Sequence, residues 1–202
     1  MKSFPEDQER PGEPTQSFLK FYGSNDDRAP RTRTTLSAVQ RAGNNKECCY
    51  PIGKRPRQVR DGALMFMGRL IENPSDVMIY GRAIAKHYED GVDDGTEADF
   101  RIRQWRREFP HCIRVRSPEF MCGTLTQGVS LNELMDVLGA EAFEATRRNR
   151  EAGRGNTDAR RSIGPQPAVQ LTAMAAAWVN VRLEERFRNV GMLTPADLAD
   201  VW

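Results

Sequence analysis

The sequence contains two histidines, His87 and His111, and this number limits the catalytic sites that it can form. A serine or cysteine nucleophile needs a base, so one of the two histidines would have to serve. His111 is followed by Cys112, but neighbouring side chains of a strand point to opposite faces, so the pair does not readily face each other. The GxSxG, Walker A and HExxH motifs are also absent. The residues therefore favour a protein without catalysis of its own, and they predict no cofactor.

Cysteines and carboxylates are the candidate metal ligands. Four cysteines are too few for a disulfide framework at this length, and the pair Cys48–Cys49 lacks the C-x₂₋₄-C spacing of structural zinc sites, as do Cys112 and Cys122. One alternative is a composite site of Cys112 and Cys122 with His111; another is weak calcium or magnesium binding in the acidic loop 89–99. Buried free thiols and a solvated loop are commoner, so no metal is predicted.

The basic residues have a composition that suits phosphate binding. Lysine and arginine together number 30, of which five are lysine, so arginine dominates. Arginine binds phosphate through two parallel hydrogen bonds and stacks on bases, although a GC-rich genome would give the same bias. The net charge is only +2, but residues 89–100 hold six acids and no base, whereas residues 101–116 hold six arginines and one acid. A local positive surface is therefore predicted.

Several of these basic residues fall at positions where a β-scaffold would present them together. Residues 53–57 precede a predicted strand, and Arg114 and Arg116 alternate with apolar residues along another. Arginines beside aromatic rings such as Phe66 and Tyr80 suit single-stranded or extruded bases. In the alternative interpretation these two rings belong to the core and the arginines are solvated or pair with acids. The predicted nucleic-acid-binding residues are Lys54, Arg55, Arg57, Arg69, Arg82, Trp105, Arg114 and Arg116.

A hairpin is the clearest structural signal. Residues 63–71 and 77–88 are rich in strand-forming types, and the loop between them contains a proline that suits a turn. Gly68 and Gly81 fall inside the two strands, which indicates bulges, curvature or the close approach of another backbone. Curved strands of this kind are typical of small barrels.

The remaining segments predict further strands in the first half and helices in the last third. Residues 18–22 and 112–116 read as strands, and residues 35–42 and 96–107 as helices. The last third has predicted helices over residues 131–138, 140–150, 172–190 and 194–202. For the longest of these, we expect Met174, Trp178, Val181 and Phe187 on the buried stripe. The predicted fold class is α+β, a small curved sheet or pseudo-barrel with packed helices.

Composition and segment boundaries predict the organisation. A mean hydropathy of −0.65 with 29% charged residues excludes an integral membrane protein, and residues 1–14 contain no apolar signal-peptide segment, so a cytoplasmic location is expected. We expect a disordered leader over residues 1–16, an α+β core over 17–140, and a helical C-terminal extension over 141–202 that packs on the core.

Three short runs give a resemblance to a known family. Residues 59–66, 79–83 and 128–134 resemble the EVE branch of the PUA-like superfamily, although Asp61-Gly62 stands where that family has Gly-Asp and Gly128 where proline is usual. The resemblance covers about residues 55–140. It implies a pseudo-barrel that binds DNA or RNA, in some members by accepting a modified base into a pocket, for which Trp105 is the best candidate here.

The sequence thus predicts a nucleic-acid-binding protein that recognises a modified or extruded base, and two other classes remain open. A nucleic-acid-acting enzyme, such as a nuclease or a restriction or defence component, would need a carboxylate cluster such as Asp61, Glu72 and Asp76 near a basic groove. A helical interaction module would bind a protein partner through the C-terminal helices, with Trp178 and Trp202 as anchors.

Overall fold

The structure is a computed structural model, and it describes most of the chain. The described residues are 16–23, 28–41, 47–51, 53–72, 75–86, 93–94, 96–102, 104–163 and 168–199. Apart from Gln16, the predicted leader over residues 1–16 lies outside them, as does Trp202.

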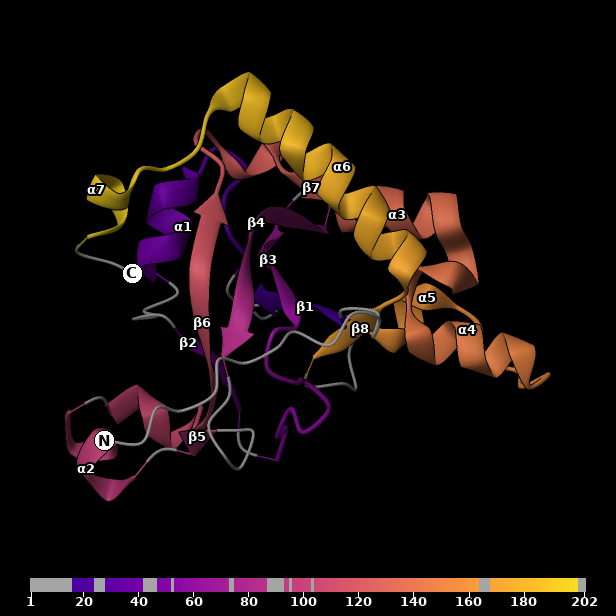
Figure 1. Cartoon of the computed structure of the whole chain (residues 1–202), viewed down its shortest axis with the longest axis horizontal. Coiled ribbons are helices and arrows are strands. Elements are labelled where there is room, and N and C mark those ends of the chain that lie inside the picture. The colour runs from indigo at the N-terminus through magenta and orange to yellow at the C-terminus, as the bar shows by residue number, and fades with distance from the viewer. Residues whose placement is uncertain are drawn as a thin grey trace, which may run out of the picture.

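Within the described ranges, eight strands form a single mixed sheet, whose arrangement Figure 1 shows. Along the main path the order is β2-β6-β4-β3-β1-β8, with β5 paired to β6 and β7 paired to β4. Only β1 and β3 run parallel among the described pairs. The strands are β1 (Ser17–Tyr22), β2 (Glu47–Tyr50), β3 (Leu64–Ile71), β4 (Asp76–Lys86), β5 (Asp93–Asp94), β6 (His111–Phe120), β7 (Val129–Ser130) and β8 (Val169–Leu171).

The predicted hairpin is confirmed by β3 and β4, and its glycines lie where the sheet bends. The antiparallel register of the two strands shifts between Met67 and Gly68, which marks a bulge. A Cβ atom on Gly81 would lie 2.3 Å from the Phe120 ring and 2.6 Å from the Glu119 carbonyl oxygen, so this position needs a glycine. The bulge and the close approach of β6 let the sheet curl, as predicted.

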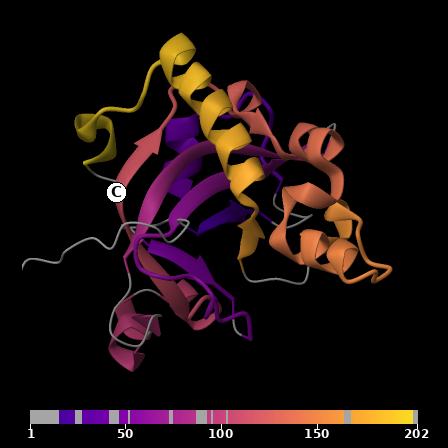
Figure 2. The same cartoon turned by 45° about the vertical axis from the view of Figure 1, so that its right-hand side comes forward.

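The curl gives the sheet two different faces. The outer face carries Phe66 and Arg82 and is covered by the helix α6 (Ala173–Val190), which lies across the strands with α3 (Leu131–Leu138) beside it (Figures 1 and 2). The concave face carries Lys20, Tyr22 and Cys48, whose strands β1 and β2 are separated by three others along the sheet. This α+β arrangement confirms the predicted fold class and is consistent with a PUA-like fold.

The other helices are short, whereas α3 and α6 begin at side-chain caps. Ser130 accepts a hydrogen bond from the Glu133 amide at the start of α3, and Thr172 accepts one from the Ala175 amide at the start of α6. No helix in the described ranges has both the length and the apolar character needed to cross a bilayer. These helices are α1 (Thr35–Arg41), α2 (Glu97–Ile102), α4 (Glu144–Glu151), α5 (Ala159–Ser162) and α7 (Pro195–Leu198), with 3₁₀ turns at Gln104–Arg107, Leu125–Gln127 and Gly139–Ala142.

The buried stripe of α6 differs from the prediction. Met174 and Val181 are 58% and 56% exposed, so their predicted burial is wrong, whereas Phe187 is buried and Trp178 is half-buried. The helix instead buries two of its alanines and one line of larger side chains. The buried residues are Ala175, Ala176, Val179, Leu183 and Phe187.

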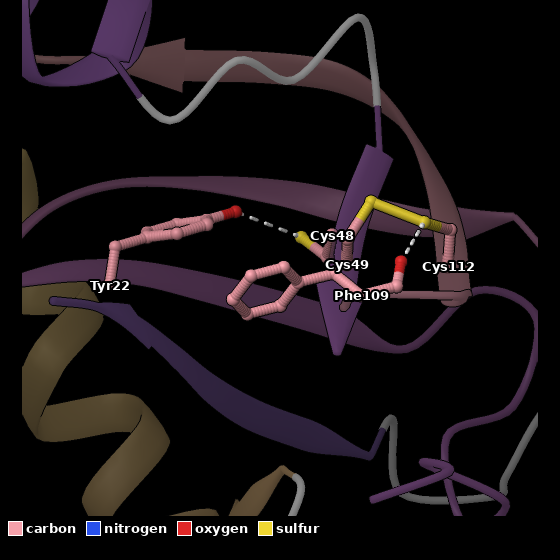
Figure 3. The surroundings of a disulfide bond; sticks show 5 residues. All are labelled: Tyr22, Cys48, Cys49, Phe109 and Cys112. Atoms are coloured by element: carbon pink, nitrogen blue, oxygen red, sulfur yellow. Dashed lines mark hydrogen bonds between the residues drawn. A yellow bond between two sulfur atoms is a disulfide. The ribbon is translucent and has the colours of Figure 1, made fainter. Parts of the chain in front are cut away.

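A disulfide joins Cys49 of β2 to Cys112 of β6 (Figure 3), so the expectation of free thiols is wrong for these two. The two residues are directly opposite in the antiparallel register, with their Cα atoms 4.2 Å apart. Their separation of 63 residues in the sequence gives no sign of this pairing. Cys48 and Cys122 do not take part in the disulfide, and because Cys112 does, the alternative zinc site with His111 is not formed.

Candidate nucleic-acid interface

One end of the sheet is built by the loop of residues 53–62 and the ends of the central hairpin. The amide of Gly62 donates to the Ala85 carbonyl oxygen at 2.9 Å, and the Ala85 amide donates to the Ala63 carbonyl oxygen at 2.8 Å. Gly62 has a φ of 79°, a conformation that favours glycine. Val59 is buried and anchors the loop. These contacts place the loop beside the last residues of β4.

Basic side chains point outward from this loop. Lys54, Arg57 and Arg60 are exposed and Arg55 is half-buried, whereas Pro56 between them is buried. The loop therefore presents the basic residues predicted from segment 53–57, together with Arg60.

Two adjacent strands present a second group of basic residues at the same end of the sheet. Arg114 and Arg116 are exposed and alternate along β6 with the buried residues Ile113 and Val115, so both arginines lie on one face, as predicted. The exposed Lys86, the last residue of β4, is directly opposite Arg114. We call Lys86, Arg114 and Arg116 the basic row.

Arg69 and Arg82 do not join the basic row. Arg69 is only 5% exposed. Arg82 donates to Glu119 at 2.6 Å, to Asn180 Oδ1 at 2.9 Å and to Glu184, the last two on α6. Burial acts to lower the pKa of Arg82, but these hydrogen bonds to the two glutamates outweigh it and raise the pKa. Both arginines are thus engaged inside the protein, because α6 covers the face on which Arg82 lies.

The aromatic residues are divided between the core and a region that is not described. Phe66 is fully buried and Tyr80 is 1% exposed, so the alternative interpretation that these rings belong to the core is confirmed. Tyr80 packs against Phe120 with ring centroids 5.9 Å apart. The backbone of Trp105 lies in the 3₁₀ turn Gln104–Arg107, and its side chain lies outside the described part of the structure.

A cavity of about 720 Å³ opens beside the loop, a feature that sequence reasoning missed. It lies between the start of β1, the residues before β3, α4 and the segment that joins β8 to α6. The oxygen Oε1 of Gln16 is buried and has no hydrogen-bond partner among the described residues. The polar lining residues are Gln16, Ser17, Arg60, Asp61, Glu144, Arg148 and Gln170.

This lining combines the groups that a nucleotide needs. Guanidinium groups bind phosphate, side-chain amides pair with base edges, and carboxylates accept hydrogen bonds from exocyclic amines. Arg60 and Arg148 belong to the basic segments of the sequence, but the two meet only because α4 packs near the loop. No local pattern in the sequence could have shown this.

The three carboxylates considered for a nuclease site do not come together. Asp76 accepts hydrogen bonds from Ser130 Oγ at 2.5 Å and from the Asn132 amide at 3.0 Å, and so caps α3. Glu72 follows the end of β3 that lies next to the start of β4, whereas Asp61 precedes the opposite end of β3. Each residue of a strand adds roughly 3.3 Å, so the eight residues of β3 keep Asp61 apart from Glu72 and Asp76. Within the described ranges, no three His, Cys, Asp or Glu side chains are placed to hold a metal ion.

The C-terminal helices leave one tryptophan near the surface. Trp178 of α6 is half-buried, and the guanidinium carbon of Arg182 lies 3.6 Å from its ring centroid. Met174 and Val181 are exposed on the same helix.

Comparison of this chain with known proteins finds similar solved structures and no match in sequence. No protein-family model matches the chain, and no curated protein matches its sequence. A hypothetical protein from Leishmania major aligns with a TM-score of 0.43 at 11% identity, over 85% of this chain and 96% of that one. Human THYN1 protein, in a crystal structure with DNA that contains 5-methylcytosine, aligns with a TM-score of 0.40 at 12% identity, over 83% of this chain and 98% of that one.

Proposed function

We propose that the protein binds nucleic acid at the basic end of its sheet and accepts an unpaired base in the neighbouring cavity. The observation that carries this proposal is the cavity lined by Arg60 and Arg148, next to a loop and a basic row that are exposed at the same end. Phosphate groups meet the arginines and lysines, and the amides and carboxylates of the cavity contact the base.

The register of the basic row supports phosphate binding. Lys86 of β4 and Glu47 of β2 are directly opposite Arg114 on its two sides, so the row combines three basic residues with one neighbouring acidic residue. The ammonium and guanidinium groups of the row can form charge-assisted hydrogen bonds with a phosphate. Arg116, two residues further along β6, extends the row for a second phosphate.

The size and lining of the cavity support binding of a base. A volume of about 720 Å³ lies within the range of small-molecule sites in proteins. The buried, unpartnered Oε1 of Gln16 is an acceptor that suits the exocyclic amine of cytosine or adenine. The resemblance of residues 55–140 to the EVE branch is the reason to include modified bases, in DNA or in RNA.

The first test of the proposal is salt-dependent binding. Fluorescence anisotropy with single-stranded and duplex oligonucleotides should show affinity that falls steeply with salt, because bound phosphates release counterions. Arg57→Ala and Arg116→Ala should each reduce the slope of log K against log salt by about one unit. Arg188→Ala, on the exposed side of α6, is the control that should leave the slope unchanged. Binding that is absent at low salt, or insensitive to salt, would exclude this function.

The second test concerns the cavity. Gln16→Met removes the unpartnered acceptor and should weaken binding of an oligonucleotide with an unpaired cytosine by about 0.5–1.5 kcal/mol. Binding of the fully paired duplex should stay the same. Asn189→Met, at an exposed position of α6, is the matched control. An equal loss for paired and unpaired substrates would place Gln16 outside the base site.

Trp105 remains a candidate stacking residue. If it stacks on a base, Trp105→Ala should cost about 1–3 kcal/mol of binding and leave the salt slope unchanged, since no phosphate contact is removed. A thermal melt of the same variant is the control. A variant that unfolds far earlier and loses all binding would identify Trp105 as a packing residue.

A further inference from the structure

The concave face holds a lysine that forms no ion pair with a carboxylate of the described residues. Lys20 of β1 is 8% exposed, and its ammonium nitrogen lies 4.3 Å from the ring centroid of Tyr50 and 5.1 Å from that of Tyr22. Among the residues that the structure describes, none forms an ion pair or hydrogen bond with this ammonium. Cation–π contacts offset part of the cost of burying the charge, but they do not satisfy its three N–H donors.

A second donor without a partner lies beside it. Tyr50 of β2 is fully buried, and its hydroxyl has no hydrogen-bond partner in the described structure. Buried polar groups are nearly always hydrogen-bonded, so such a group calls for an explanation such as a bound ligand. This hydroxyl, on a ring whose centroid lies 4.3 Å from the Lys20 ammonium, indicates a ligand that supplies acceptors.

The surrounding groups favour an anion. Lys54 is close enough to act electrostatically on Lys20, and Arg69 acts in the same way on Tyr80. Burial, the largest cause, lowers the pKa of Lys20 to about 8; the charge of Lys54 adds to this, whereas Cys48 opposes it. A negative ligand would reverse the effect of burial, because an opposite charge nearby favours the ammonium form.

We propose that the concave face binds a terminal phosphate group, with Lys20 Nζ and Tyr50 Oη as donors. A phosphate offers several acceptor oxygens and a charge that both Lys20 and Lys54 attract. The site lies on the opposite face of the sheet from the basic row, although it shares Lys54 with the loop of the proposed interface. The phosphate comes from a mononucleotide or from the 5′ end of an oligonucleotide.

Titration with inorganic phosphate tests the proposal directly. In the full chain, the Lys20 side-chain resonance followed by NMR should shift with phosphate, and its pKa should rise by at least one unit. Phosphate should also raise the Tm of the wild type more than sodium chloride does at the same ionic strength. Lys20→Met should abolish the Tm response to phosphate, and Tyr50→Phe should weaken phosphate binding several-fold. Arg188→Met removes a positive charge from an exposed position and should respond like the wild type.

Two further measurements keep the result decisive. Without phosphate, Lys20→Met should be at least as stable as the wild type, because it removes a buried charge; should that variant fail to fold, the wild-type NMR titration decides alone. Binding of adenosine monophosphate is compared with binding of one oligonucleotide sequence prepared with a 5′-phosphate and with a 5′-hydroxyl group. The comparison distinguishes a mononucleotide from the 5′ end of an oligonucleotide as the source of the phosphate. The proposal is overturned if phosphate and chloride act equally on the wild type, or if Lys20 does not respond to phosphate. Either result would leave the salt slopes of the Arg57 and Arg116 variants intact.

Discussion

The hydroxyl of Tyr22 donates a hydrogen bond to the sulfur of Cys48 at 3.8 Å, although their strands β1 and β2 are separated by three others in the sheet (Figure 3). Two strands so far apart in the order can meet only if the sheet curls strongly. The contact therefore closes the concave face and holds the buried Lys20 between rings from both strands.

The disulfide between Cys49 and Cys112 should contribute strongly to stability. It closes a loop of 63 residues, and loss of such a cross-link typically costs about 2–4 kcal/mol of unfolding free energy. Urea unfolding with and without a reductant measures the difference, and Cys122→Ser is the control with the cross-link intact. Thiol titration of the unfolded, unreduced protein should find two free thiols; four would contradict the pairing.

Arg82 should be the residue that fixes α6 to the sheet. Arg82→Met removes the hydrogen bonds to Glu119, Asn180 and Glu184 and leaves these groups unpaired, so we expect a loss of about 1–3 kcal/mol in unfolding free energy. Chemical denaturation measures it. Arg188→Met on the same helix should have little effect, and equal stability of the two variants would show that packing alone holds the helix.

The orientation of α6 can be tested with two substitutions two residues apart, because such positions point to nearly opposite sides of a helix. Leu183 is fully buried, so Leu183→Ala should cost about 2–5 kcal/mol of unfolding free energy. Val181 is 56% exposed, so Val181→Ala should change stability by less than about 0.5 kcal/mol. Urea denaturation of both variants suffices. A larger loss of stability for Val181→Ala than for Leu183→Ala would instead support the buried stripe predicted from the sequence.

Stability should rise with pH in the alkaline range because of Lys20. Burial lowers its pKa from 10.5 to about 8, so between these values the unfolded chain binds more protons than the folded one. The unfolding free energy therefore increases with pH in this window, by about 3 kcal/mol if Lys20 acts alone. Lys54 and Cys48 face Lys20 and contribute with opposite signs. Urea unfolding at a series of pH values should show the rise in the wild type and not in Lys20→Met.

The tyrosines of the concave face should end this rise. Burial raises the pKa of Tyr22, Tyr50 and Tyr80 above 10.0, with Cys48 as a second cause. Above about pH 10 the unfolded chain loses phenolic protons that the folded protein keeps, so stability falls again. The unfolding free energy is therefore expected to reach its maximum near pH 10. A steady fall in the unfolding free energy from neutral pH upward would show that folding does not lower the pKa of Lys20.

Local sequence patterns predict the central hairpin. The features that the sequence does not predict depend on contacts between residues that are far apart in the chain. The turn proline and the glycines of residues 63–88 are local signals, so β3, β4 and the bend at Gly68 could be predicted. The disulfide depends on the register of β2 against β6. The three residues of β8 form a strand only because β1 lies beside them.

The candidate interface shows the same division. The alternation of Arg114 and Arg116 with buried residues is a local pattern, and the structure places both on one face. The burial of Arg82 depends on α6, whose Asn180 is 98 residues away in the sequence. The cavity needs Gln16, Arg60 and Arg148 from three separate segments, and no spacing in the chain brings them together.

The position of β1 between β3 and β8 also has a consequence for the order of folding. Ser17 is opposite Leu64 on one side and opposite Leu171 on the other, so its strand acquires its second neighbour only when most of the described chain is available. Contacts of such large sequence separation slow folding, because a long loop must close before they form. During synthesis on the ribosome, β1 will therefore wait with one edge unpaired until residues 169–171 emerge, and this interval is when the nascent chain most needs protection from aggregation.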